Sequence, residues 1–254
     1  MTALGDFMGL VLAGRKRCIA PRSGILHSMD GRSTLGLRFV PLLGALWVVL
    51  VVAGYLVAGD TPDHHALGGE IRESYDSETQ HQIAAFLVAL GAVPLLFFAG
   101  YFRAVLRRLH PSGRLSANVA MAGAVVAATG LAVQALIHAA LAEAAQTSEF
   151  SDEALQSLNA LDGWSFYPYV IGLSAFVLAS GVALVRGRRF FAPFLGWAAV
   201  VLGVLALVPL VGFFAAILSA SWVLIISVTL FARFDAVDRL WEDAGQARPP
   251  DAAT

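Results

Sequence analysis

The chain alternates long apolar stretches with short polar segments, and each apolar stretch has roughly the length of a membrane-spanning helix. A bilayer core of about 30 Å needs roughly 20 apolar residues in a helix. Four stretches with clear ends meet this length, namely Phe39–Val57, Ile83–Phe102, Asn118–His138 and Phe166–Val185. A further block runs from Phe190 to Ala232 without one charged residue, long enough for two spans that turn near Pro209 and Gly212.

The apolar runs also predict the type of secondary structure. Backbone polar groups must be paired inside lipid, which leaves helices and closed barrels as spanning structures. Barrel strands alternate apolar and polar residues, whereas these runs are continuous. We therefore predict an all-α fold, a six-helix transmembrane bundle built from three helical hairpins over residues 37–233.

The predicted bundle is flanked by two polar tails. Residues 1–36 do not resemble a signal peptide, because their basic residues follow a short apolar piece instead of preceding it. We expect them to form a disordered cytoplasmic tail. Met1 and Met29 are both possible starts of translation. Residues 234–254 are expected to form a cytoplasmic C-terminal tail.

Charge patterning predicts the orientation in the membrane. Sixteen of the seventeen basic residues lie on one side of the predicted spans, and only Arg72 lies on the other. By the positive-inside rule the arginine-rich side is cytoplasmic. Eleven of the eighteen acidic residues lie on the opposite side, between Asp60 and Glu78 and between Glu143 and Asp162. This predicts a cell-membrane protein with both termini in the cytoplasm.

Composition narrows the classes of partner and chemistry. The chain is 58% hydrophobic and 14% charged, whereas soluble domains carry about 25% charged residues. The expected partner is the lipid bilayer, and no basic patch indicates a nucleic acid. Cys18 is the single cysteine, which excludes an intrachain disulfide and a cysteine-built metal site.

Rows of small residues recur at helical spacing in three predicted spans. Such rows let helices approach each other closely. They predict helix packing, and they also allow a protein partner or a homo-oligomer. The rows are Gly123, Ala127 and Gly130; Ala175 and Ala179; and Gly196, Ala199 and Gly203.

Four of the six histidines gather on the predicted outer side and are the main candidates for chemistry. His64 and His65 lie in the acidic first loop, and His81 and His138 lie near the outer ends of their helices. Imidazole with carboxylate suits zinc and other divalent metals. The candidate metal ligands are therefore His81, His138, His64 and His65, with a solvated acidic loop that holds no specific metal as the alternative. A haem between His81 and His138 is a further geometric possibility.

The pattern as a whole resembles multi-pass integral membrane proteins of GC-rich bacteria. The resemblance rests on the exit from the first span, Gly59-Asp60-Thr61-Pro62-Asp63, the arginine-rich exit Arg103–Arg108, and the end of the final hairpin, Phe231-Ala232-Arg233. It covers roughly residues 37–233 and implies no activity and no functional residue.

Two classes of function remain open from the sequence. The favoured one is a non-enzymatic membrane protein with a structural, partner-binding or sensory role, because the spans carry no catalytic constellation. The alternative is a small transporter or permease, which should show a polar strip along facing helices. Polar residues in the spans are only scattered, namely Thr129, Gln134, Ser174, Ser219 and Ser221.

Overall fold

A computed structural model describes residues 38–63, 65–109, 113–187, 193–208 and 211–237, and every regular element within these ranges is a helix. The helices are α3 (Leu42–Ala58), α4 (Gly68–Ser74), α5 (Glu78–Leu109), α6 (Arg114–Gln146), α7 (Asp152–Trp164), α8 (Tyr167–Arg186), α9 (Pro193–Leu205) and α10 (Gly212–Ala232). The predicted all-α class is confirmed for this part of the chain. The tail 1–36 and most of the tail 234–254 lie outside it.

The long apolar block divides into two helices. Helix α9 ends at Leu205 and α10 begins at Gly212, so the helices break where two spans were predicted to meet. Pro209, expected in the turn, lies outside the described residues. Elsewhere local signals set the helix starts: Ser151 caps α7 through its side chain, 3.4 Å from the Ala154 nitrogen, and a proline opens α8.

Four helical segments are long and apolar enough to cross a membrane. They are α5, α6, the run Asp152–Arg186 that joins α7 to α8, and α10. The apolar helices α3 and α9 are shorter, with 17 and 13 residues. By length and composition these segments indicate an integral membrane protein with four candidate spans among the described residues, and the predicted count of six is not confirmed.

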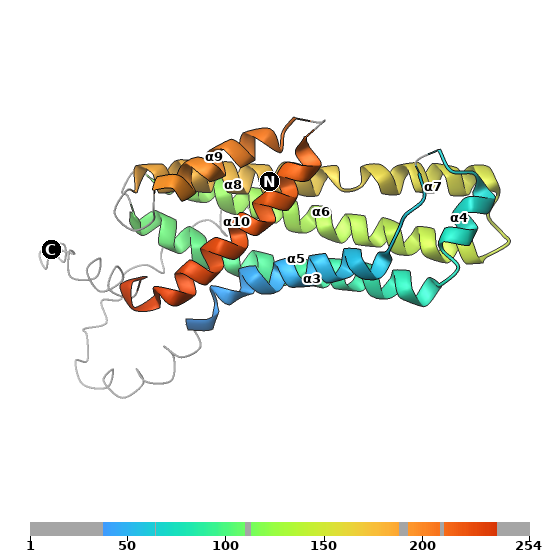
Figure 1. Cartoon of the computed structure of the whole chain (residues 1–254), viewed down its shortest axis with the longest axis horizontal. Coiled ribbons are helices and arrows are strands. Elements are labelled where there is room, and N and C mark those ends of the chain that lie inside the picture. The colour runs from blue at the N-terminus through green and yellow to red at the C-terminus, as the bar shows by residue number, and fades with distance from the viewer. Residues whose placement is uncertain (1–37, 64, 110–112, 188–192, 209–210, 238–254) are drawn as a thin grey trace, which may run out of the picture. The chain divides into compact units, whose positions relative to one another are not determined.

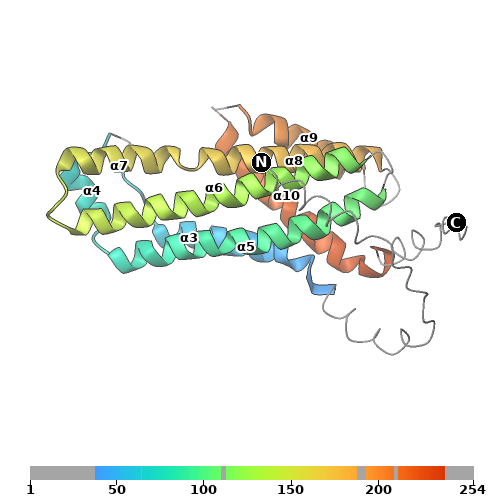
Figure 2. The ribbon, with the colours of Figure 1, turned by 180° about the vertical axis from the view of Figure 1, so that it is seen from behind.

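The six apolar helices follow one another as neighbours around a ring. Helix α3 lies beside α5, α5 beside α6, α6 beside α8 and α8 beside α9, while α10 contacts both α9 and α3. Helix α10 runs obliquely to the others (Figures 1 and 2). Helix α9 contacts α10 but packs more extensively on α8, and the predicted arrangement of three hairpins is not confirmed.

Small residues explain the closest helix pairs. A Cβ atom added at Gly172 of α8 would overlap the backbone nitrogen of Ala127 in α6, and one added at Gly130 would overlap that of Tyr169. On α9, Gly203 faces the backbone of Leu178. Glycines of the predicted rows thus pack helices against one another within the chain.

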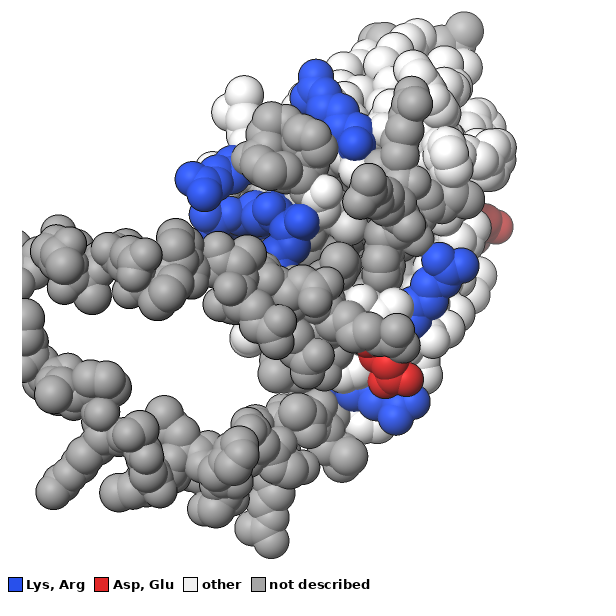
Figure 3. Space-filling model, turned by 90° about the vertical axis from the view of Figure 1, so that its left-hand side faces the viewer, with Lys and Arg blue, Asp and Glu red and all other residues white. Residues whose placement is uncertain are grey.

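The outside of the bundle is apolar, and the charges lie at its two ends. Large side chains that would be unfavourable in water face outward on several helices, for example Leu56, Phe86, Leu136, Phe194 and Phe214. Basic side chains spread over one end, which we call the arginine end (Figure 3). It carries exposed arginines at the ends of α5, α6, α8 and α10, namely Arg107, Arg108, Arg114, Arg186 and Arg233.

The opposite end carries a small folded cap, which we define as residues 59–63, 65–77 and 147–164. It contains α4 and α7, which lie together at one end of the bundle (Figure 1). The cap has its own apolar core with α6, in which Ile71, Tyr75, Leu141 and Leu155 are fully buried. This core is separate from the bundle core.

Candidate functional site: a buried histidine chain under the cap

Three polar side chains from three helices meet beneath the cap. His81 lies in the first turns of α5, His138 in the last third of α6, and Asp162 near the end of α7. His81 Nδ1 lies 3.3 Å from His138 Nε2, and His138 Nδ1 lies 3.1 Å from Asp162 Oδ2. The side chains of His138 and Asp162 are only 12% and 13% exposed, and His81 is buried. These three side chains form one continuous line of polar contacts, which we call the histidine chain.

The histidine chain ends at a backbone carbonyl group of α4. His81 Nε2 lies 3.2 Å from the carbonyl oxygen of Ser74, so all four ring nitrogens of the two histidines have a partner. The chain therefore links α4, α5, α6 and α7, and it joins both segments of the cap to the bundle. No ring nitrogen is left to activate a serine, threonine or cysteine nucleophile.

Tyr75 covers the histidine pair. Its ring centroid lies 4.4 Å from that of His81 and 5.5 Å from that of His138. Burial, and secondarily the nearby Asp162 carboxylate, raise the pKa of the Tyr75 phenol, which therefore stays protonated. The hydroxyl is buried close to the Asp162 carboxylate.

Helix length places the histidines at this level. Helices α5 and α6 have 32 and 33 residues, well beyond the roughly 20 that cross a bilayer core. Their extra turns project from the apolar section and carry His81 and His138. The run from α7 into α8 projects similarly and brings Asp162 alongside.

The four histidines proposed as metal ligands have different positions. His81 and His138 lie together, whereas His65 is exposed on the loop, where its backbone nitrogen bonds Asp63. His64 lies outside the described residues. In the part of the chain that the structure describes, no three His, Cys, Asp or Glu side chains are grouped as metal ligands. His81 and His138 together would supply two ligands, whereas zinc sites in proteins have three or four protein ligands.

The haem hypothesis concerns the same two rings. A haem between His81 and His138 would place a flat macrocycle between their facing nitrogens. These nitrogens lie at hydrogen-bond distance from each other, so the observed arrangement leaves no space for it.

Asp162, Tyr75 and the Ser74 carbonyl were not identified from the sequence. Asp162 is 24 residues from His138, and His138 is 57 residues from His81, so no local spacing marks the set. Only part of α7 is buried against its neighbours: Leu155 is fully buried, whereas Leu161 is 51% exposed. The segment 151–161 belongs to a capped helix that packs on α4 and α6.

Arg72, the one basic residue on the acidic side of the predicted spans, links α4 to the end of α6 and to the α6–α7 connection. Its guanidinium donates to the carbonyl oxygens of Ala145, Thr147 and Phe150 at 3.0, 2.8 and 2.7 Å. It also lies 3.7 Å from Asp152, which is largely exposed and adds little. A cation at the C-terminal end of α6 is favourable because the last carbonyl groups carry partial negative charge.

Replacing Arg72 should loosen the α6–α7 connection. We expect Arg72→Ala to lower cap stability by about 2–3 kcal/mol, because three charge-assisted hydrogen bonds are lost from a partly exposed group. Arg72→Lys should be intermediate, since one ammonium group cannot span three carbonyl groups. Hydrogen exchange of residues 147–155 measures the effect, with Arg186→Ala at the opposite end as the control. Unchanged exchange in Arg72→Ala would contradict the assignment.

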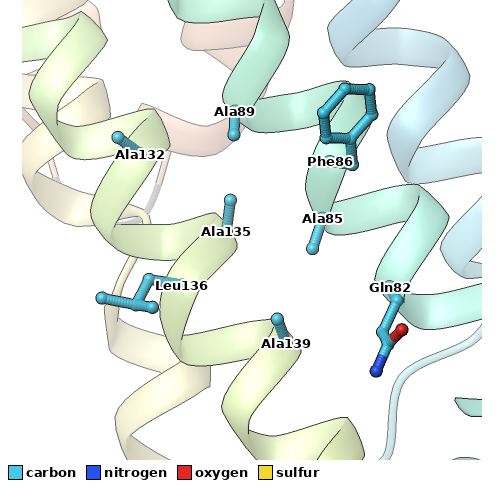
Figure 4. A pocket seen from close by; sticks show the side chains of 8 residues that line it. All are labelled: Gln82, Ala85, Phe86, Ala89, Ala132, Ala135, Leu136 and Ala139. Atoms are coloured by element: carbon cyan, nitrogen blue, oxygen red, sulfur yellow. The ribbon is translucent and has the colours of Figure 1, made fainter.

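The bundle between the two ends offers little polar chemistry. Ser174 Oγ of α8 donates to the Gly203 carbonyl oxygen of α9 at 2.5 Å, and Ser219 Oγ donates to that of Ala215 within α10 at 2.7 Å, so both hydroxyls are satisfied by backbone groups. A shallow groove between α5 and α6 is lined by five alanines with Phe86, Leu136 and Gln82 (Figure 4). This lining suits lipid hydrocarbon and contains no acid, base or nucleophile.

Comparisons with known proteins add no further assignment. No protein-family model matches the chain, and neither a curated protein nor a solved structure matches it.

Proposed function

We propose that the chain is a non-enzymatic protein of the cytoplasmic membrane whose folded cap, on the outer face, senses the exterior or binds a partner there. The carrying observation is the construction of the cap. Two segments about 80 residues apart in the chain share one apolar core, and the histidine chain and Arg72 hold them together. A loop that merely connected two spans would need none of these contacts.

The proposal includes six spans with both termini in the cytoplasm. Helices α3 and α9 carry outward apolar side chains like those of the four longer segments, for example Leu56 and Phe194. Both are also closed into the ring of helices. The exposed arginines at the end opposite the cap support a cytoplasmic position for that end.

Cysteine labelling tests the orientation and the class of function together. With Cys18 replaced, Ser77→Cys and Ser157→Cys should react with an impermeant thiol reagent in intact cells, because both positions are exposed on the cap. Asp235→Cys, exposed at the arginine end, should react only after the cells are opened. Reaction of Asp235→Cys in intact cells would overturn the orientation.

The same panel separates this function from transport. Ser174 and Ser219 are fully buried in the bundle. Cysteines at these positions should stay unreactive toward a small charged reagent from either side, because no polar strip gives water access. Fast labelling of either cysteine in the membrane would indicate a water-filled path and favour a small transporter or permease.

A further inference from the structure

The hydrogen-bond roles along the histidine chain follow from its two ends. The Ser74 carbonyl oxygen can only accept a hydrogen bond, and so can an ionised Asp162 carboxylate. His81 Nε2 and His138 Nδ1, which face these oxygens at 3.2 and 3.1 Å, must therefore both carry hydrogen. A neutral imidazole has one N–H group, so in two neutral rings these positions would use both hydrogens.

The consequence concerns the two nitrogens in the middle. With both rings neutral, His81 Nδ1 and His138 Nε2 would present bare lone pairs to each other at 3.3 Å. Two acceptors at that distance repel each other, and leaving a buried polar group without a hydrogen bond costs free energy. One additional proton removes the conflict, because an imidazolium at His138 donates to His81 from one nitrogen and to Asp162 from the other.

We propose that the His81–His138 pair binds one proton beyond two neutral rings, and that this proton holds the cap closed on the bundle. The proposal rests on the proposed function of the cap and names protons from the exterior as the signal that it reads. The chain Asp162–His138–His81–Ser74 then has a donor for every acceptor. It connects the cap to α5 and α6 through charge-assisted contacts, which are stronger than neutral ones.

The charged and titratable groups around the pair favour one positive charge. Asp162 from α7 contacts His138 directly. Burial, and then the neighbouring His138, lower the pKa of His81 against the smaller opposing effects of the Ser74 carbonyl group and Asp76, so the extra proton is placed on His138. Tyr75 covers both rings as a neutral phenol. Glu78, one turn before His81 on α5, is bonded to the Gln82 amide.

The side of the pair that faces α3 is uncharged. Tyr55 of α3 exchanges hydrogen bonds with the Gln134 amide of α6 at 2.9 and 3.1 Å. Arg72 donates to the carbonyl oxygens of Ala145, Thr147 and Phe150. The immediate surroundings therefore contribute negative charge, which a single proton on the pair partly neutralises.

Both gain and loss of a proton should weaken the contact. Without the proton, two lone pairs face each other; with a second proton, two N–H groups and two positive charges face each other. The cap should therefore be closed most tightly over an intermediate range of pH and loosen on either side of it.

Nitrogen NMR of the full-length protein with 15N-labelled histidine, in detergent micelles with a chelator, counts the protons directly. At neutral pH we expect one ring with both nitrogens protonated, and one neutral ring protonated at Nε2. His138→Gln and His81→Gln assign the signals, and the exposed His65→Gln is the control that should change neither. Asp162→Asn should reduce the number of protonated ring nitrogens in the His81–His138 pair from three to two. Two neutral rings in the unaltered protein would overturn the proposal, as would two imidazolium rings or signals of a bound metal.

A thiol placed in the cap core tests whether the proton holds the cap. Ala66 is 7% exposed in this core, so Ala66→Cys should react slowly while the cap is closed. Relative to the exposed Ser77→Cys, which corrects for thiol ionisation, we expect labelling about tenfold faster at either end of the pH range. Asp162→Asn should remove this minimum. A pH-independent ratio would overturn the proposal, whereas equal reactivity of the two thiols at every pH would instead overturn the folded cap.

Discussion

Alanine at Gly172 is expected to disrupt the packing of α6 against α8 and to destabilise the whole bundle. The added Cβ would overlap the Ala127 nitrogen, and would lie 2.8 Å from both the Ala127 Cα and the Gly123 carbonyl oxygen. All three are backbone atoms of a regular helix, which cannot rotate aside as a side chain does. Overpacking of this kind costs about 1–3 kcal/mol or more, and we expect the upper end.

Thermal unfolding in detergent and the monodisperse fraction after purification measure this effect. The control is Gly100→Ala on α5, where an added Cβ meets no atom within 4 Å. Alanine is favoured over glycine inside a helix by roughly 0.5–1 kcal/mol, so the control should be unchanged or slightly stabilised. If Gly172→Ala melted at the temperature of the unaltered protein, the close crossing would be wrong.

Leu155→Ala is expected to open the cap while leaving the bundle folded. Leu155 is fully buried in the cap core, and removing such a side chain costs about 2–5 kcal/mol through lost burial and the cavity that remains. The cap core is small and separate from the bundle core, so the loss falls on the cap alone. Labelling of Ala66→Cys should accelerate strongly.

Leu161→Ala provides the matched control on the same helix. Leu161 is 51% exposed, and a surface substitution of this kind usually changes stability by less than about 0.5 kcal/mol. Its labelling rate should equal that of the unaltered protein. Unfolding of the bundle together with the cap in Leu155→Ala would show that the two cores are one cooperative unit.

Helix α7 and Arg72 differ in how much of their structure the sequence indicates. The leucines of 151–161 are compatible with either an amphipathic surface helix or a capped loop, and the structure shows a capped helix. The sequence did not identify the surface that the helix covers. Arg72 was recognised only as an exception to the charge asymmetry, since its three carbonyl partners lie more than 70 residues away.

The sequence by itself determined the helical class, the apolar segments, the break between α9 and α10, and the separation of basic from acidic ends. These follow from hydropathy and charge read over about twenty residues at a time, because lipid imposes the same requirement on every spanning segment. The tertiary structure alone decided that the small-residue rows are filled by the chain's own helices and that His81, His138 and Asp162 form one chain. Those contacts depend on how far each helix projects and how it is rotated against its neighbours, and packing among distant segments sets both.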